Sequence, residues 1–255
     1  MRVILLKNII LYLLFIIYYK SAFANENPNQ FKIEADKSIE YFEKQKTYVA
    51  SGNAKASKGK FTIKAEKIAI FMSNTKDSDI THVEASGDVI ILNENTIAKS
   101  SFAKYNFKNK YIILRGKYQF IESKKFKITS KKFISFDDIN KIAKSEGDVY
   151  LSLNSSISVF SDKISANFDR FNNTLITAFA NGNVKVKTKS ETITSNSAKY
   201  DSKTNLVALK GDVVINRDNN LISGEKGFMN LKTRKSKIES EKSKRVKGVF
   251  KPANK

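Results

Sequence analysis

The sequence contains no cysteine, one histidine and two prolines among its 255 residues. A chain without cysteine has no disulfide, no thiol nucleophile and no thiolate metal ligand, so its core must be held by burial and strand pairing. At this length a sizeable core is feasible. Pro28 and Pro252 lie near the two ends, so no proline interrupts a β-sheet between them.

His82, the single histidine, lies at the end of a polar stretch, Met72–His82, near Asp77 and Asp79. A metal site needs more ligands at defined spacing. A Ser-His-Asp triad would depend on this one residue, and the sequence has no Gly-x-Ser-x-Gly elbow and no glycine loop that binds phosphate. The pair Asp137-Asp138 falls in an expected turn, where a carboxylate is usually solvated. We therefore expect no enzyme, no cofactor and no metal.

The first 24 residues are typical of an export signal. Arg2 and Lys7 supply positive charge ahead of a twelve-residue, mostly apolar run, Asn8–Tyr19. The small-residue cleavage site Ala22-Phe23-Ala24 follows this run. A spanning helix usually needs about 20 apolar residues. We predict cleavage after Ala24, with retention of residues 1–24 as a membrane anchor as the alternative.

The chain is strongly basic, with a net charge of +21. Removal of residues 1–24 takes away three cations and no acid, which leaves +18. Such a charge favours anionic partners, including anionic lipid or phosphorylated glycolipid. The alternative is a lysine-rich composition that only solvates the strand faces. The charge is spread along the chain rather than gathered in one stripe, so we expect no nucleic-acid partner.

Two short patterns alternate along the chain. In the first, a glycine and a polar residue precede alternating apolar residues; in the second, Ile-x-Ala is followed by an acid and a lysine, as at Ile33 and Ile63. The second pattern begins again near Ile97, Ile128, Val159, Ile193 and Ile222. The glycines of the first pattern are Gly52, Gly87, Gly116, Gly147, Gly182 and Gly211. Successive glycines are 35, 29, 31, 35 and 29 residues apart, so each of the first three lies 95 residues before one of the last three. Interleaved repeats of this length predict stacked supersecondary units.

Alternation with period two after each glycine predicts β-strands with one covered face. The glycine itself is expected at a bend or bulge, where a wide sheet turns over its partner. The predicted fold class is therefore all-β: two facing antiparallel sheets in an elongated sandwich or jelly roll of about seven two-strand repeats. An open end of such a fold can pair with another copy by strand addition.

The C-terminal segment is expected to be different. Residues 232–255 carry ten Lys or Arg against two acids. We predict a basic, disordered tail over residues 239–255. Alternatively, Val246–Phe250 forms a last strand that orders only when another protein pairs with it.

An ordered set of motifs resembles one known family. Ile33-x-Ala35-Asp36, Gly52-Asn53-Ala54 and Phe61-x-Ile63-x-Ala65-Glu66 look like the opening of the OstA-like domain of LptA-type lipopolysaccharide-transport proteins. The stretches 198–213 and 224–233 resemble a further copy and the closing strand. The resemblance covers about residues 31–238. We place the domain at 25–238, with a division into two related halves, 31–127 and 128–231, as an alternative. The chain is longer than the usual member.

The resemblance implies an open β-jelly roll with a V-shaped section and an apolar interior that binds lipid A. It implies a periplasmic protein that stacks end to end and bridges an inner-membrane extraction complex and an outer-membrane translocon. Lys37 and Lys67 are candidates for facing phosphates. The candidates for lining the lipid groove are Ile33, Ala35, Ala54, Ile63, Ala65, Val89, Ile91, Ile97, Val149, Val184, Val186, Val213 and Ile215.

Each of these assignments has a competitor. The apolar candidates could simply pack a closed sandwich, since covered strand faces are usually core, and an exposed lysine is usually only a solvated charge. At the level of function, the rivals are an inner-membrane-anchored handoff component of the same fold (LptC-like) and a structural or adhesin-like β-repeat protein without lipid binding.

Overall fold

The computed structural model describes residues 31–74, 79–154, 156–218, 220–233, 235–240 and 245–250. The predicted export signal, residues 1–24, lies outside them. All regular elements within these ranges are β-strands, which confirms the predicted all-β class. None of these residues forms a helix long and apolar enough to cross a membrane.

The chain divides into two compact units. The described residues of the N-terminal unit are 31–124, with the exception of 75–78, together with Lys131–Lys141. The C-terminal unit contains Lys125–Ser130 and the described residues from Ile142 onward. Short strands near residue 130 therefore belong alternately to one unit and the other.

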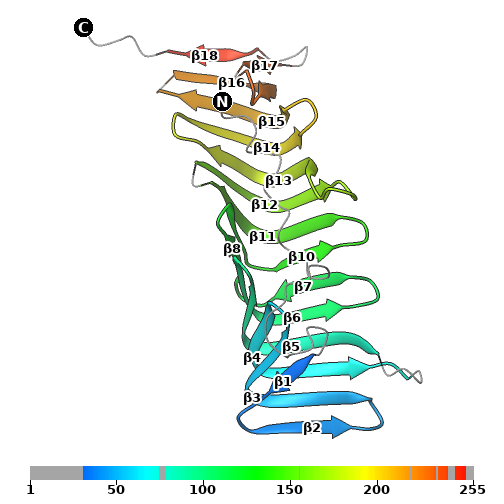
Figure 1. Cartoon of the computed structure of the whole chain (residues 1–255). Coiled ribbons are helices and arrows are strands. Elements are labelled where there is room, and N and C mark those ends of the chain that lie inside the picture. Colours follow the sequence, from blue (N-terminus) through cyan, green and yellow to red (C-terminus); the bar gives the residue numbers. More distant parts are fainter. Residues whose placement is uncertain are drawn as a thin grey trace. The chain divides into compact units, whose positions relative to one another are not determined.

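The N-terminal unit is built from hairpins that follow one another in chain order (Figure 1). Its strands are β1 (Lys32–Glu34), β2 (Ser38–Phe42), β3 (Thr47–Lys58), β4 (Phe61–Met72), β5 (Ile80–Asn93), β6 (Thr96–Asn106), β7 (Tyr111–Arg115), β8 (Gln119–Ser123) and β10 (Phe133–Asp137).

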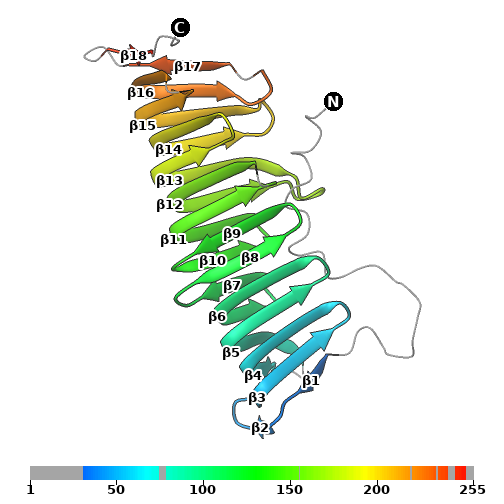
Figure 2. The same ribbon diagram turned by 90° about the vertical axis from the view of Figure 1, so that its left-hand side faces the viewer.

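The C-terminal unit repeats the arrangement, and its hairpins are seen from the side in Figure 2. Its strands are β9 (Phe126–Ser130), β11 (Ile142–Leu153), β12 (Ile157–Phe168), β13 (Leu175–Lys187), β14 (Glu191–Asp201), β15 (Leu206–Arg217), β16 (Asn220–Asn230), β17 (Ser236–Glu239) and β18 (Lys247–Val249).

The long strands bend at their glycines. In β3, Gly52 and Asn53 both have positive φ, +83° and +46°, and the register with β4 shifts between Ser51 and Ala54. Glycine, asparagine and aspartate are the residues that adopt this left-handed conformation most readily, which explains why the pattern pairs them. The same pairs bend β5, β11, β13 and β15, so the predicted bulges are confirmed.

Because each long strand is bent, its two halves belong to two different sheets. In the N-terminal unit the first sheet has the order β2-β3-β4-β5-β6-β7-β10. The second sheet has the order β1-β3-β4-β5-β6-β8. All these pairings are antiparallel. The two sheets thus share β3 to β6 and are joined along the line of bulges.

The C-terminal unit has the same design. Its first sheet runs from β11 through β16 to β17, and its second sheet runs from β9 through the other halves of β11 to β16 to β18. Each unit is therefore a pair of antiparallel sheets made from the same bent strands, as expected for a jelly roll.

The backbone repeats itself at the 95-residue spacing found in the sequence. Turn and bulge residues with positive φ occur in matched pairs across the two units. These pairs are Lys46 and Lys141, Asn53 and Asp148, Gly59 and Asn154, Asp88 and Asn183, Lys110 and Asn205, and Gly116 and Gly211. The units are therefore built from equivalent turns and bulges.

Two sequence interpretations require correction. His82 does not end a loop, because β5 already begins at Ile80 and His82 pairs directly with Phe71 of β4. The tail is not wholly irregular, because β18 pairs with β16 inside the same chain, with Val249 opposite Leu221. The high charge of the tail favoured disorder, but a short alternating segment within it is enough to form a strand of three paired residues.

Candidate functional site

The candidate site is the space between the two sheets of each unit. Strand β5 shows how it forms: Val83 and Ala85 are buried in the first sheet, and Val89 and Ile91 are buried in the second. The bulge at Gly87 separates the two pairs and lets both point inward. Alternation on each half of the strand thus produces two apolar faces that look toward each other.

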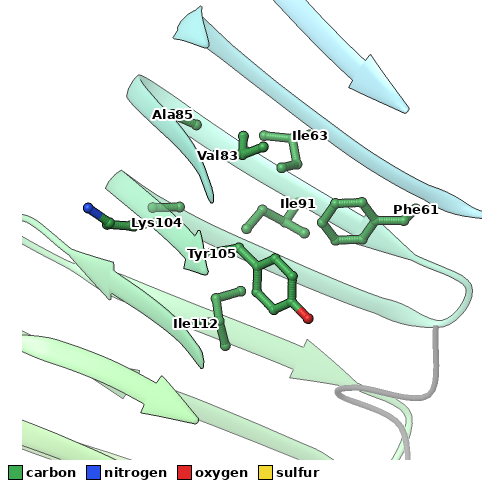
Figure 3. Close-up of a pocket in the computed structure, with 9 residues that line it drawn as sticks. Phe61, Ile63, Val83, Ala85, Ile91, Lys104, Tyr105 and Ile112 are labelled. Atoms are coloured by element: carbon green, nitrogen blue, oxygen red, sulfur yellow. The ribbon is translucent and has the colours of Figure 1, made fainter. Parts of the chain in front are cut away.

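Figure 3 shows this arrangement in the N-terminal unit. Phe61, Ile63 and Ile91 come from the second sheet, and Val83, Ala85, Ala103, Tyr105 and Ile112 come from the first; together they enclose a small pocket, to which Lys104 also contributes. The ammonium group of Lys104 points away from the cluster and forms an ion pair with Glu84 at 2.8 Å. The interior is therefore apolar, and the charge of this lysine lies outside it.

The pocket is nearly full of side chains. Its volume is about 10 Å³, which is close to the minimum for one water molecule. An acyl chain cannot enter this space unless the inner side chains move or the two sheets separate. Occupancy by lipid therefore requires a change in conformation.

The C-terminal unit has an equivalent interior. A buried cluster joins the two sheets there, with Val186, Ala198, Val207, Leu231 and Ile238 packed against it. The buried residues of the cluster are Ile193, Leu209, Val213, Ile215 and Met229. Val213 and Ile215 come from one sheet and Leu209 and Met229 from the other, so the bend in β15 again closes the space.

Most of the sequence-predicted lining residues lie on these inner faces. Ile33, Ala35 and Val186 are half-buried. Nine others are buried: Ala54, Ile63, Ala65, Val89, Ile91, Val149, Val184, Val213 and Ile215. Whether any of them contacts lipid stays a prediction.

Ile97 was assigned to the wrong face. Its side chain is 41 % exposed, whereas its neighbours Thr96 and Ala98 are both buried at 6 %. Ala98 pairs with Ile91 on the inner face, so Ile97 must point outward beside Leu92. Here the larger apolar residue is outside and the smaller ones are inside, contrary to the expectation from hydrophobicity alone.

The two candidate cations lie outside the interior. Lys37 and Lys67 are both exposed. Lys37 crosses over Gly52 and forms an ion pair with Glu66 at 3.3 Å. An exposed pair of this kind contributes little to stability, and either lysine remains accessible to an anion.

Sequence reasoning missed the inner residues that follow each bend. Ile68 and Ile70 are buried, although the parity of Ile63 and Ala65 places them on the opposite face. The signal was present, because Glu66 and Lys67 are two consecutive polar residues that mark the change of parity.

Tyr105 and Tyr200 were also missed. They lie 95 residues apart on the first sheet of their units, and burial is the main cause that raises the pKa of each phenol. A second, smaller cause in each case is a carboxylate, Asp138 for Tyr105 and Asp201 for Tyr200. Each unit therefore holds a partly buried phenol beside its apolar inner residues.

The apolar inner face reaches an edge of the N-terminal unit. The described pairings of β2 are with β3 alone, and Ile39 and Tyr41 of β2 are 49 % and 48 % exposed. Tyr41 packs against Tyr48 with ring centroids 4.6 Å apart. In the C-terminal unit, Val249 and Phe250 beside β18 are also exposed. Exposed apolar residues on an edge strand are suited to further strand pairing.

The described residues contain no group of three or more histidine or acidic side chains that could hold a metal ion. Two buried hydroxyls near the bends are satisfied locally: Ser100 donates to the carbonyl of Phe102 at 3.0 Å, and Ser195 donates to that of Ser197 at 3.1 Å. These serines, again 95 residues apart, stabilise the bends.

A search of curated proteins gave no match. Among solved structures, the chain is similar to LptH from Pseudomonas aeruginosa, described as the LptA homologous periplasmic component of a conserved lipopolysaccharide transport device. That similarity has 15 % identity and a TM-score of 0.44 over 50 % of this chain and 95 % of the other.

The family model described as "LptA/(LptD N-terminal domain) LPS transport protein" matches twice, at residues 32–136 and 127–235. These two matches cover most of the chain and follow the repeat seen in the backbone. The chain therefore belongs to the family of LptA and LptD N-terminal domain lipopolysaccharide transport proteins.

Proposed function

We propose that this protein is a periplasmic lipopolysaccharide carrier that holds the acyl chains of lipid A between the two sheets of its units. The observation that carries the proposal is the pair of facing apolar surfaces joined along a line of bulges. Each CH₂ group exposed to water costs about 0.8 kcal/mol. A multi-acyl lipid therefore needs a covered apolar route through an aqueous compartment.

Binding proceeds by separation of the two sheets. The inner residues around the pocket are mainly small or aliphatic, with Phe61 and Tyr105 beside them, and the pocket is about 10 Å³. Because the sheets are joined only along the bulges, their far sides can move apart without breaking any strand pairing. Lipid then replaces the contacts between the sheets, and surface lysines such as Lys37 and Lys67 face its phosphates.

We further propose that copies continue the route by strand addition. Strand β2 offers an edge with exposed apolar residues, and β17 and β18 lie last in the other unit. An added strand contributes backbone hydrogen bonds and extends both sheets. By family membership, the partners are then a second copy, an inner-membrane extraction complex and an outer-membrane translocon.

Site-specific photocrosslinking in cell envelopes tests the inner site. A photoreactive residue replaces Ile63 or Val89, which are buried, and the matched control replaces Lys64, the exposed neighbour of Ile63. Adducts with lipopolysaccharide at Ile63 and Val89 but not at Lys64 are expected. Normal export and folding without inner adducts would overturn the proposal.

A disulfide lock tests the opening step, since the chain has no cysteine of its own. Ile63→Cys and Val83→Cys place one thiol on each sheet around the pocket. The control, Ile63→Cys with Ile91→Cys, joins two directly paired residues of a single sheet. Oxidation should abolish lipid uptake in the first variant and leave it unchanged in the second.

One observation favours a second candidate, a structural β-repeat protein without lipid binding. The nearly full interior is what a closed sandwich would have. If neither the oxidised nor the reduced inter-sheet variant binds lipid, this candidate is preferred, whereas equal uptake by both forms would contradict only the proposed separation of the sheets. The anchored handoff component differs by retention of residues 1–24, which mass determination of the exported protein decides.

A further inference from the structure

The outer face of the second sheet in the C-terminal unit carries an unusual set of side chains. Cross-strand pairing places them in two rows over β9, β11, β12, β13 and β14. The first row is Thr129, Tyr150, Phe160, Lys185 and Thr194; the second row is Lys127, Ser152, Ser158, Lys187 and Thr192. The rows combine lysines, aromatic rings and hydroxyls.

Two aromatic rings form the centre of this face. Tyr150 and Phe160 pack with centroids 5.0 Å apart, and the ammonium nitrogen of Lys187 lies 5.9 Å from the Phe160 centroid. Lys185 pairs directly across from Phe160. Phe160 is 36 % exposed, so part of its ring is accessible to a ligand.

The face is positively charged, since neither row contains a carboxylate. Within the described part of the chain, no ion pair engages Lys185 or Lys187. Glu191, at the start of β14, is already bound to Arg217 at 2.7 Å. Both lysines are exposed and thus available to an anion.

Hydroxyl groups lie beside these cations. The Tyr150 hydroxyl is 3.5 Å from Ser158 Oγ, and Ser158 pairs directly across from Lys187. Hydrogen bonds from Ser158 and then Ser152, together with the positive charge of Lys127, lower the pKa of Tyr150. The local surroundings therefore favour negative charge at this position.

The N-terminal unit shows that the fold does not require this composition. The corresponding row of its second sheet is Glu34, Lys55, Lys64, Ile90 and Lys99. There Lys55 forms an ion pair with Glu34 at 3.1 Å, and Ile90 occupies the position of Lys185. Both rows contain lysines, but only the row of the C-terminal unit combines them with aromatic rings.

We propose that this outer face binds a phosphorylated saccharide. Lys185, Lys187 and the Ser158 hydroxyl bind the phosphate through charge-assisted hydrogen bonds. The rings of Tyr150 and Phe160 provide an apolar surface for the C–H face of a sugar, and the half-buried Thr192 and Thr194 bind its hydroxyls. A peptide or a bilayer is a poorer match, because the two rows consist mainly of lysines and hydroxyl-bearing side chains and contain only two aromatic rings.

The test measures binding of deacylated lipopolysaccharide oligosaccharide to the full exported chain by calorimetry at about 0.15 M salt, where unspecific charge effects are screened. Lys185→Gln with Lys187→Gln should weaken binding at least tenfold, and Phe160→Ala severalfold. The control, Lys55→Gln with Lys64→Gln, removes the same charge from the other unit. The probe has no acyl chains, so the result does not depend on the inner site.

Three results would overturn the proposal: no binding of the oligosaccharide, equal weakening by both lysine pairs, or equal affinity for inorganic phosphate. A dephosphorylated oligosaccharide should bind at least tenfold more weakly; undiminished binding would also contradict it. Binding of intact lipopolysaccharide distinguishes a lipid-linked saccharide from a free one. An equal loss of affinity for intact and deacylated forms indicates a lipid-linked saccharide, and a loss for the deacylated form alone indicates a free one.

Discussion

The side-chain amide of Asn183 donates to both carboxylate oxygens of Asp162, at 3.2 and 3.1 Å. The carboxylate lies over Gly182, where a β-carbon would be only 2.1 Å from Asp162 Oδ2. Asn53 and Asp36 form the same bond at 2.8 Å in the N-terminal unit. At Gly182-Asn183 the two residues therefore act together: the glycine makes room for Asp162 of the preceding strand β12, and the asparagine binds it.

Gly182→Ala should destabilise the protein by roughly 2–3 kcal/mol. The φ of +76° is unfavourable for alanine by about 1–2 kcal/mol, and the new methyl group also displaces Asp162. Gly59→Ala is the control, since its φ is +58° and nothing lies within 4 Å of the added carbon. Denaturant unfolding should show the smaller loss for Gly59→Ala; equal losses would mean that contact with Asp162 is irrelevant.

Val213→Ala should lower the free energy of unfolding by roughly 2 kcal/mol. Val213 is fully buried in the cluster of the C-terminal unit, so truncation removes apolar contacts and leaves a cavity. Val214→Ala, on the opposite face of the same strand, should cost less than about 0.5 kcal/mol. A similar cost for both would contradict the assignment of inner and outer faces.

The stability of the N-terminal unit should fall as pH decreases below about 6.5, the ordinary pKa of histidine. Burial and then the charge of Lys104 lower the pKa of His82, against an opposing effect of Glu84. The ring, stacked on Phe71 at 4.0 Å, is therefore kept neutral in the folded state. Its stabilisation is fully present above pH 6.5 and is lost as pH falls through the lowered pKa.

His82→Gln isolates this contribution, because His82 is the only histidine. The difference in unfolding free energy between wild type and variant should be constant above pH 7 and decrease in favour of the variant below 6.5. A difference that is independent of pH from 7.5 to 5 would show that the imidazole does not titrate differently on folding.

Removal of residues 241–255 should increase self-association. The deletion takes away β18 and leaves the second-sheet half of β16 without this partner, and an unpaired edge readily accepts another strand. Sedimentation at matched protein concentration measures the effect. In a control variant, a linker of glycine, serine and lysine with equal length and charge replaces the segment. This variant should self-associate like the deletion. If it behaves like wild type, the charge of the segment and not its strand pairing is responsible.

The sequence was informative wherever side-chain type and backbone conformation agree. Gly182-Asn183 predicted a bulge because few other residues accept two consecutive positive φ angles. Val89, Val184 and Val213 were placed inside because they directly follow such a bulge, which fixes their parity.

The failures have equally specific causes. Ile97 follows a turn whose length sets the register of β6, and no local pattern reveals that Thr96 and Ala98 are the residues that face Ile91 and its neighbours. His82 was assigned to a loop because polar composition outweighed short alternation, and the strand at Val246–Phe250 was expected only as an alternative that orders on a partner protein, whereas β18 pairs with β16 of the same chain. Tertiary pairing, which a single sequence does not display, decides such positions.

The recurrence of the same bent hairpin has a consequence for folding. Strands 95 residues apart, such as β5 and β13, present equivalent bulges and similar inner faces, so each is a plausible partner for the other's neighbours while the chain is incomplete. Mispaired intermediates of this kind are a characteristic hazard of repeated sequences. The copies differ in the side chain that lies over each glycine, for example Lys37 at Gly52 and Asp162 at Gly182. Such differences therefore also help a strand to pair with its own neighbour rather than with that of another copy.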